Sequence, residues 1–224
     1  MEFYAVILTA LCLLNAALIR HKHRSQPAQQ ATHPMLPVDS AKQRAAQRFQ
    51  RSFLAVYGFA VAADWLQGPH IYALYKYEKQ LPEEMVAMLY TAGFISGAIS
   101  ATVAGQLVDR RGRRSGCYDY ALYCCFSCGL MISNRLPLLF LSRILGGVAT
   151  TLLFSAFESW MVAEYHFLEL DDSVLPLRTI FDNMALVSST VAILSGIAGD
   201  ALVHASGQRF MPFLAAQACC LTIL

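Results

Sequence analysis

The sequence predicts an all-α polytopic membrane protein, and three observations lead to this fold class. Apolar residues make up 56% of the chain and charged residues only 14%, about half the charge of a typical soluble domain. The mean hydropathy is +0.45. Six segments are long and apolar enough to cross a bilayer, which takes roughly 20 helical residues, and a seventh begins near the end. We therefore expect a helical bundle of about six spans.

The expected spans follow one another along the chain with polar connections between them. They lie at approximately residues 3–19, 53–75, 85–108, 116–133, 137–163, 179–203 and from 210 onward. The first span has no basic residue before it and is followed by Arg20-His21-Lys22-His23-Arg24. This charge order favours a retained anchor over a cleaved signal peptide. We expect an additional anchor over 1–19, a linker over 20–51 and a bundle over 52–224.

The linker over 20–51 is polar and carries seven Lys and Arg residues. We expect it to be flexible, with a short helix over 39–50 lying along the membrane, where anionic lipids would be attracted. Alternate connections hold twelve and four of the Lys and Arg residues, and the twelve include those of 20–51 and 109–114. Basic loops favour the cytoplasm, so these two segments are expected there and the N-terminus outside.

The most informative motif joins the spans 85–108 and 116–133. It reads Gly105-Gln-Leu-Val-Asp109-Arg110-Arg111-Gly112-Arg113-Arg114. Four arginines within five residues cannot enter hydrocarbon, so this turn must lie at a membrane surface. Asp109 can pair with the arginines, and Gly112 permits the tight reversal that so short a connection needs.

A stripe of small residues precedes this motif on the same span. Gly93, Gly97, Ala101 and Gly105 recur at intervals of four, which places them on one helical face. Such a face allows two helix backbones to approach closely, so we interpret it first as a packing surface. A helix that slides during transport would also use it.

Asp64 lies near the middle of the span 53–75, where an unpaired carboxylate would cost several kcal/mol. It must face a partner, a cavity or a proton. Gly68 and Pro69 follow one turn later and predict a kinked or interrupted helix, whose free backbone groups can contact a substrate. A structural ion pair to a basic residue of the bundle is the equally weighted alternative.

Arg143 lies about six residues inside the span 137–163, or roughly 9 Å along the helix axis. Its planar fork of donors matches two oxygens of an oxyanion at once. We favour a role in substrate binding or proton coupling. A structural salt bridge and an anchor at the membrane interface are the alternatives.

Two further polar residues are candidates for the same path. Glu158 is fifteen residues beyond Arg143 on one helix and could accept a proton or hold a neighbouring cation. Asn183 opens the span 179–203 and could reach a cavity, although its position at a helix end explains it as well.

Several classes of protein are disfavoured by the sequence. The net charge of +2 makes nucleic acid a poor partner, and no phosphate loop, nucleophile elbow or metal-ligand spacing appears, so we expect neither an enzyme nor a cofactor. The seven cysteines lie in or beside apolar segments and are interpreted as reduced packing residues. Cys125-Phe-Ser-Cys128 lacks the flanking strand and second ligand pair of a redox or metal motif.

The motif over 105–114 resembles the loop signature of the major facilitator superfamily of secondary transporters. Arg143-Ile-Leu-Gly-Gly147 is similar to the Arg-x-x-x-Gly pattern of the fourth helix in that fold. More specifically, Asp64-Trp65-Leu66-Gln67-Gly68-Pro69, Leu107-Val108-Asp109 and the run from Arg143 to Trp160 resemble the eukaryotic molybdate-anion transporter family. The likeness covers most of residues 53–170.

This resemblance implies two six-helix halves around an anion path that rock between outward-open and inward-open states. Residues 52–224 would be the N-terminal half, incomplete in itself, so we expect a longer protein. The conformational gating motif would consist of Gly105, Asp109, Arg110, Gly112, Arg113 and Arg114.

The resulting hypothesis is a cell-membrane importer of molybdate. Arg143 would contact the oxyanion, and Asp64, Glu158 and Asn183 would complete a substrate or proton path. Sulfate, a sugar or an organic ion is the alternative cargo. A non-transporting receptor or scaffold that recruits acidic lipids or a protein through residues 20–51 is the alternative function.

Overall fold

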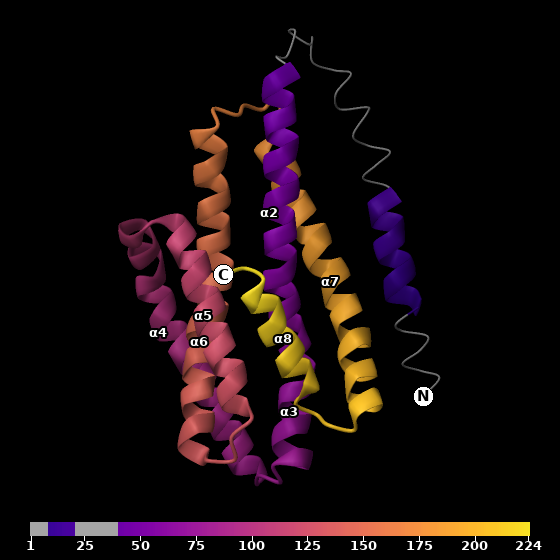
Figure 1. Cartoon of the computed structure of the whole chain (residues 1–224), viewed down its shortest axis with the longest axis vertical. Helices are drawn as coiled ribbons and strands as arrows, with labels where there is room; N and C mark the ends of the chain where they lie inside the picture. The colour runs from indigo at the N-terminus through magenta and orange to yellow at the C-terminus, as the bar shows by residue number, and fades with distance from the viewer. Residues whose placement is uncertain (1–8, 21–39) are drawn as a thin grey trace.

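The computed structural model describes residues 9–20 and 40–224, and every regular element in these two ranges is helical (Figure 1). Expectations that fall on residues 1–8 and 21–39 lie outside the described residues. The first helix is Thr9–Arg20. The following elements are α2 (Ser40–Gln67), the 3₁₀ turn η1 (Gly68–His70), α3 (Ile71–Ala73), the π-helical turn η2 (Leu74–Glu78), α4 (Glu83–Arg111), α5 (Arg113–Met131), α6 (Leu136–Phe167), α7 (Leu177–Ser206) and α8 (Met211–Leu221). The expected all-α architecture is confirmed.

Three helices, α4, α6 and α7, are both long and apolar enough to cross a membrane. They contain the expected spans 85–108, 137–163 and 179–203. The helix Thr9–Arg20 and α8 are apolar but shorter. The expected span 53–75 falls on α2 to η2, and the expected span 116–133 falls on α5 except for its last two residues, while the total number of spans stays a prediction.

The expected interruption after Asp64 is present. α2 ends at Gln67, and Gly68 and Pro69 begin a 3₁₀ turn before the chain resumes helical structure. Proline lacks the amide hydrogen that an α-helix needs at this point, which explains the break. At its other end α2 runs without interruption from Ser40, so the expected helix over 39–50 is not a separate element. Ala46 is already buried. Residues 40–52 contain no glycine or proline that would separate this part of α2 from the part that follows.

The helices form two groups that are joined by an aromatic cluster and by the packing of α8 against α5. α4 and α5 both pack along α6, while α7 and α8 pack along α2, as Figure 1 shows. The rings of Tyr120 and Phe157 lie 5.5 Å apart edge to face, and the ring of Tyr57 lies 6.1 Å from that of Phe157. Phe53 contacts Trp160 at 5.4 Å. These contacts connect α2, α5 and α6 through buried side chains.

The small-residue stripe of α4 packs over only half of its length. A methyl group on Gly147 of α6 would collide with the carbonyl oxygen of Gly93 and lie 2.9 Å from the amide nitrogen of Gly97. The two helix backbones therefore touch at this crossing. Farther along, Ala101 is exposed and a methyl group on Gly105 would have nothing within 4 Å among the described atoms. The packing interpretation holds for Gly93 and Gly97.

The additional N-terminal helix lies beside α7 (Figure 1) and contacts it through polar side chains. The Asn15 amide nitrogen donates to the Ser189 hydroxyl at 3.1 Å, and the Thr190 hydroxyl donates to the Asn15 amide oxygen at 3.2 Å. Hydrogen bonds of this kind hold helices together in lipid, where water does not compete.

Candidate functional site

A cavity of about 460 Å³ lies between α2, α4, α5 and α6. It contains Asp64 and Arg143, the two candidate residues that were expected well inside membrane spans. Its remaining walls combine small residues of α4 and α6 with hydroxyl, amide and thiol groups. The polar lining residues are Asp64, Gln67, Tyr90, Tyr120, Cys124, Ser127, Arg143, Thr150 and Thr151.

Arg143 enters the cavity from α6, and two features of α4 make room for it. Its guanidinium carbon lies 5.6 Å from the centre of the Tyr90 ring, within cation–π range. Its Nη2 lies only 3.0 Å from the point that a Cβ on Gly93 would occupy. The guanidinium is thus held between an aromatic ring and bare backbone. A larger residue at position 93 would displace it.

The charge of Arg143 has no counter-charge at contact distance. Within the described residues, the ion pairs closer than 4.0 Å do not include Arg143. Its Nε is buried and has no hydrogen-bond partner in the described part of the chain. A buried donor without a partner costs free energy, and it costs more on a charged group. The structural salt-bridge alternative for Arg143 therefore finds no support in this arrangement.

Asp64 lies in the last turn of α2 and faces α6. The Thr150 hydroxyl approaches its carboxylate at 3.5 Å and also donates to the carbonyl oxygen of Gly146 at 3.1 Å. Asp64 is absent from the ion pairs found in the described residues, although it shares the cavity with Arg143. One acid and one base thus face the same space without neutralising each other directly.

Hydrogen bonds hold together the helices that surround the cavity. Ser127 of α5 and Ser142 of α6 each donate a hydroxyl to the other's carbonyl oxygen, at 2.9 and 2.8 Å. The Gln67 amide nitrogen donates to the carbonyl oxygen of Ala63 at 2.8 Å and to the Cys124 sulfur at 3.2 Å. Ser142 precedes Arg143 directly, so the serine pair sets the position of the arginine backbone.

Sequence reasoning identified the two charges of this cavity and missed its neutral lining. Thr150 is seven residues after Arg143, which is two helical turns, so the two side chains were bound to share a face of α6. That spacing was visible in the sequence. Tyr90 and Gln67 could not have been found in the same way, because their approach to Arg143 and Cys124 depends on how separate helices pack.

Glu158 and Asn183 do not line this cavity. Glu158 is exposed on α6, and its fifteen-residue separation from Arg143 corresponds to roughly 22 Å along the helix. Asn183 is half-buried on α7. The expected grouping of these two residues with Asp64 and Arg143 is therefore not found in this arrangement.

The motif over 105–114 covers the end of α4 and the start of α5, and Gly112 alone connects the two helices. Gly112 has φ of +99°, a conformation that residues with a Cβ rarely adopt, which explains glycine at this position. Asp109 lies 3.6 Å from Arg113, whose guanidinium donates to the carbonyl oxygen of Ser159 on α6 at 3.5 Å.

Arg114 makes a second link from this turn to α6. Its Nη2 donates to both carboxylate oxygens of Glu164, at 2.9 and 2.8 Å, and its guanidinium lies 6.0 Å from the Trp160 ring. Sequence reasoning gave Glu164 no partner. Both links connect the α4–α5 turn to the far end of α6, the helix that carries Arg143.

The cysteines are free in the described residues, and no group of His, Cys, Asp or Glu there has the arrangement of a metal site. Four of the seven, Cys117, Cys124, Cys128 and Cys220, are buried as expected for packing residues. Cys12 is exposed on the N-terminal helix, which differs from that expectation.

The chain is similar to known transporters. The MFS_5 family, described as sugar transporters with 12 transmembrane segments, matches residues 35–224. The molybdate-anion transporter of Danio rerio is 38% identical over 157 residues, which is 70% of this chain and 31% of that protein. The proteins of the same name from Takifugu rubripes and Xenopus tropicalis are 36% and 35% identical over 70% and 69% of the chain, and over 32% and 34% of their own lengths. The chain thus spans about a third of these relatives. No solved structure matches it.

Proposed function

The chain belongs to the MFS_5 family of the major facilitator superfamily, and we propose that it forms the first half of a secondary transporter that takes up molybdate with high affinity. The relatives named molybdate-anion transporter support this cargo. The observation that carries the proposal is the buried, unpartnered Nε of Arg143, which shares a cavity with Asp64 but forms no ion pair within 4.0 Å in the described residues.

Molybdate is a tetrahedral dianion, and Arg143 offers what such an ion needs. A guanidinium presents parallel donors that match two oxygens, and a charge-assisted hydrogen bond is about twice as strong as a neutral one. The free Nε would gain its missing acceptor when the anion binds. The hydroxyls of Thr150 and Thr151 and the amide of Gln67 donate to protein acceptors in this structure and would exchange those bonds for the remaining oxygens of the anion within the same cavity. The loss of hydration on entering the membrane would be offset in this way.

The other candidate residues take supporting roles in this proposal. Asp64 tunes the charge of the cavity or carries a proton. Glu158 serves at the far end of α6, about 22 Å from Arg143. Asn183 contributes from α7.

The proposed topology has six spans and the start of a seventh, with the N-terminus outside and the segments 20–51 and 109–114 in the cytoplasm. The positive-inside rule supports this orientation, because these segments carry most of the Lys and Arg residues. The gating motif would hold one conformation of the transport cycle through its links to α6. Its members are Gly105, Asp109, Arg110, Gly112, Arg113 and Arg114.

A second candidate cargo is a neutral sugar. The family description favours it, and the hydroxyl and amide groups that line the cavity would suit sugar hydroxyls. Against it stands the unpartnered Nε of Arg143, for which a charged oxyanion is a stronger hydrogen-bond acceptor than a neutral sugar hydroxyl. Sulfate shares the shape and charge of molybdate and is the nearest competing anion. A receptor or scaffold function would rest on the basic linker 20–51, of which residues 21–39 lie outside the described part of the chain.

The experiment is uptake of labelled molybdate by cells that lack their own high-affinity system and express the full-length protein. We expect saturable uptake that excess sulfate does not abolish. Arg143→Ala should raise the KM by about tenfold or more, because it removes charged hydrogen bonds of on the order of 1.5–3 kcal/mol. Arg135→Ala is the matched control, since Arg135 is exposed in the turn before α6.

Two outcomes would contradict the proposal. Absence of uptake despite confirmed surface expression would remove molybdate as the cargo. Unchanged molybdate uptake by a well-expressed Arg143→Ala protein would remove the role of Arg143 and leave the cargo standing.

A further inference from the structure

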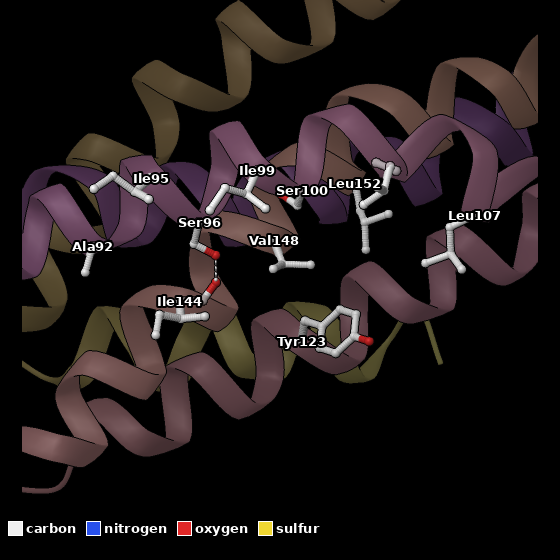
Figure 2. Close-up of a pocket in the computed structure, with 12 residues that line it drawn as sticks. Ala92, Ile95, Ser96, Ile99, Ser100, Leu107, Tyr123, Ile144, Val148 and Leu152 are labelled. Carbon is white, nitrogen blue, oxygen red and sulfur yellow. Dashed lines mark hydrogen bonds between the residues drawn. The ribbon is translucent and has the colours of Figure 1, made fainter.

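A second cavity, of about 570 Å³, lies between α4, α5 and α6 and is almost entirely apolar (Figure 2). α4 and α5 both pack along α6 but touch each other little, which leaves a groove between them. One face of α4 lines the groove from Ala92 to Leu107. Tyr123 of α5 and the residues Ile144, Val148 and Leu152 of α6 complete it.

The few polar groups in this groove are already hydrogen-bonded. The Ser96 hydroxyl donates to the carbonyl oxygen of Ile144 at 2.8 Å, the bond drawn in Figure 2. The Ser100 hydroxyl bonds to the carbonyl oxygen of Gly97 and to the Thr151 hydroxyl, both at 3.0 Å. An occupant would therefore find little to hydrogen-bond with, and must itself be apolar along its length.

The groove is long, narrow and open to the side of the bundle. From Ala92 to Leu107 the helix rises roughly 22 Å, more than the ~15 Å thickness of one leaflet's hydrocarbon. Its outer rim is formed by Ile95, Ile99 and Val103, which are 54%, 65% and 54% exposed. An extended hydrocarbon chain fits this shape, and the surrounding bilayer supplies such chains at high local concentration.

Positive charge follows directly after the end of the groove. Arg110 and Arg111 come one turn beyond Leu107, on the same face of α4. Arg113 is engaged by Asp109, and Arg114 by Glu164.

The two arginines nearest the groove are the least engaged. Arg111 is 3.9 Å from Asp119, and Arg110 is in none of the ion pairs found in the described residues. A phosphate at the membrane surface would meet both guanidinium groups there.

We propose that this groove is a binding site for a phospholipid with an anionic headgroup. One acyl chain lies along α4 between Ala92 and Leu107, and the headgroup phosphate contacts Arg110 and Arg111. The lipid belongs to the leaflet that the arginine-rich turn faces. Its acyl chain packs on the same helix whose Gly93 and Gly97 touch α6 beside Arg143, so the lipid supports the helix that shapes the anion cavity.

The test uses purified full-length protein, stripped of lipid and then offered equal amounts of phosphatidylglycerol and phosphatidylcholine with identical chains. Native mass spectrometry counts the lipids retained. We expect phosphatidylglycerol to be retained at least about fivefold better, because each arginine near an anionic surface contributes about that factor. Arg110→Gln with Arg111→Gln should reduce its retention to that of phosphatidylcholine. Val148→Trp, which fills the groove, should lower the retention of both lipids.

Two control variants and a second readout keep the result interpretable if Val148→Trp does not fold. Arg135→Gln removes an exposed arginine elsewhere, and Leu194→Trp enlarges an exposed apolar residue of α7; neither should alter retention. In the wild-type protein, a phosphatidylglycerol with a photoreactive acyl chain should label the segment 92–107 in preference to α7.

Four results would overturn the proposal. Equal retention of the two lipids by the wild type would remove the headgroup contact, as would retention that is unchanged when Arg110 and Arg111 are neutralised. Photolabelling spread evenly over the apolar surface would mean an ordinary lipid annulus. Cross-linking of a probe in the groove to a distant part of the polypeptide would mean that the protein itself covers this face.

Discussion

The guanidinium of Arg143 lies against the backbone of Gly93, with Nη2 3.0 Å from the place that a Cβ would take. This contact couples two properties of α4. The missing Cβ of Gly147 lets α6 touch the backbone of α4 at Gly93, and the missing Cβ of Gly93 leaves the space that the arginine occupies. Helix packing and the position of the candidate anion-binding charge therefore depend on two adjacent glycines, one on each helix.

Gly93→Ala should weaken transport more than it weakens the fold. The added methyl group must displace the guanidinium from its place beside Gly93, and we expect the KM for molybdate to rise by about tenfold, the cost of one misplaced charged hydrogen bond. Initial uptake rates over a range of molybdate concentrations measure it. Gly196→Ala is the control, because a methyl group there meets nothing within 4 Å among the described atoms. Equal KM values for the two variants would show that Arg143 is not held in this position during transport.

Gly147→Ala should destabilise the bundle itself. Its methyl group would overlap the backbone of α4 at Gly93 and Gly97, and overpacking of this kind costs about 1–3 kcal/mol. Thermal unfolding of the detergent-solubilised protein should shift to lower temperature. Gly58→Ala, whose methyl group would meet Val187 at an ordinary 3.6 Å, should leave the midpoint nearly unchanged. A Gly147→Ala protein as stable as the wild type would mean that α4 and α6 are farther apart than the structure places them.

The loop between α6 and α7 should respond to acid through Asp171. The Ser173 hydroxyl and the amides of Ser173 and Val174 donate to its carboxylate at 2.6, 3.1 and 3.1 Å, and these bonds lower its pKa. A lowered folded-state pKa means that the stabilisation is complete above the unfolded pKa near 3.9 and is lost as the pH falls through the folded value. The hydrogen-exchange protection factors of the Ser173 and Val174 amides, which are corrected for the intrinsic slowing of exchange in acid, should therefore fall in this acid range. Asp171→Ala should abolish the pH dependence and Asp172→Ala should preserve it.

The fold was largely predictable because the signals for membrane helices are local. The break at Gly68 and Pro69 could be predicted from the two residues alone, since proline removes a backbone donor wherever it occurs. The small-residue stripe was predicted correctly at Gly93 and Gly97 but not at Gly105, because the stripe does not reveal how far a partner helix follows it. A helix over 39–50 was predicted, but its continuity with the span 53–75 was not, since the polar residues 40–51 gave no sign that Ala46 would be buried.

The site was only partly predictable for a different reason. Asp64 and Arg143 stood out because a charge within an apolar span always needs an explanation. Tyr90 is one of many aromatic residues in the chain, and only the crossing of α4 and α6 brings it to Arg143. Glu158 met the same criterion as Arg143 and yet is exposed, because polarity within a helix does not specify which face turns toward the cavity.

Asp64→Asn separates the two roles that remain open for this carboxylate. The substitution removes a negative charge from the cavity that Arg143 and a bound dianion would share, so the KM for molybdate should fall by a few-fold, because charges in such an environment interact by about 1 kcal/mol or more. If Asp64 also carries a proton, the same variant should lose accumulation of molybdate driven by a pH gradient in proteoliposomes of the full-length protein. Thr150→Val is the matched comparison, since it removes the 3.5 Å hydrogen bond and keeps the charge. It should raise the KM through the lost Thr150 hydroxyl but leave accumulation intact at saturating molybdate. A raised KM in Asp64→Asn, together with normal accumulation, would instead assign Asp64 a structural role beside the interruption of α2.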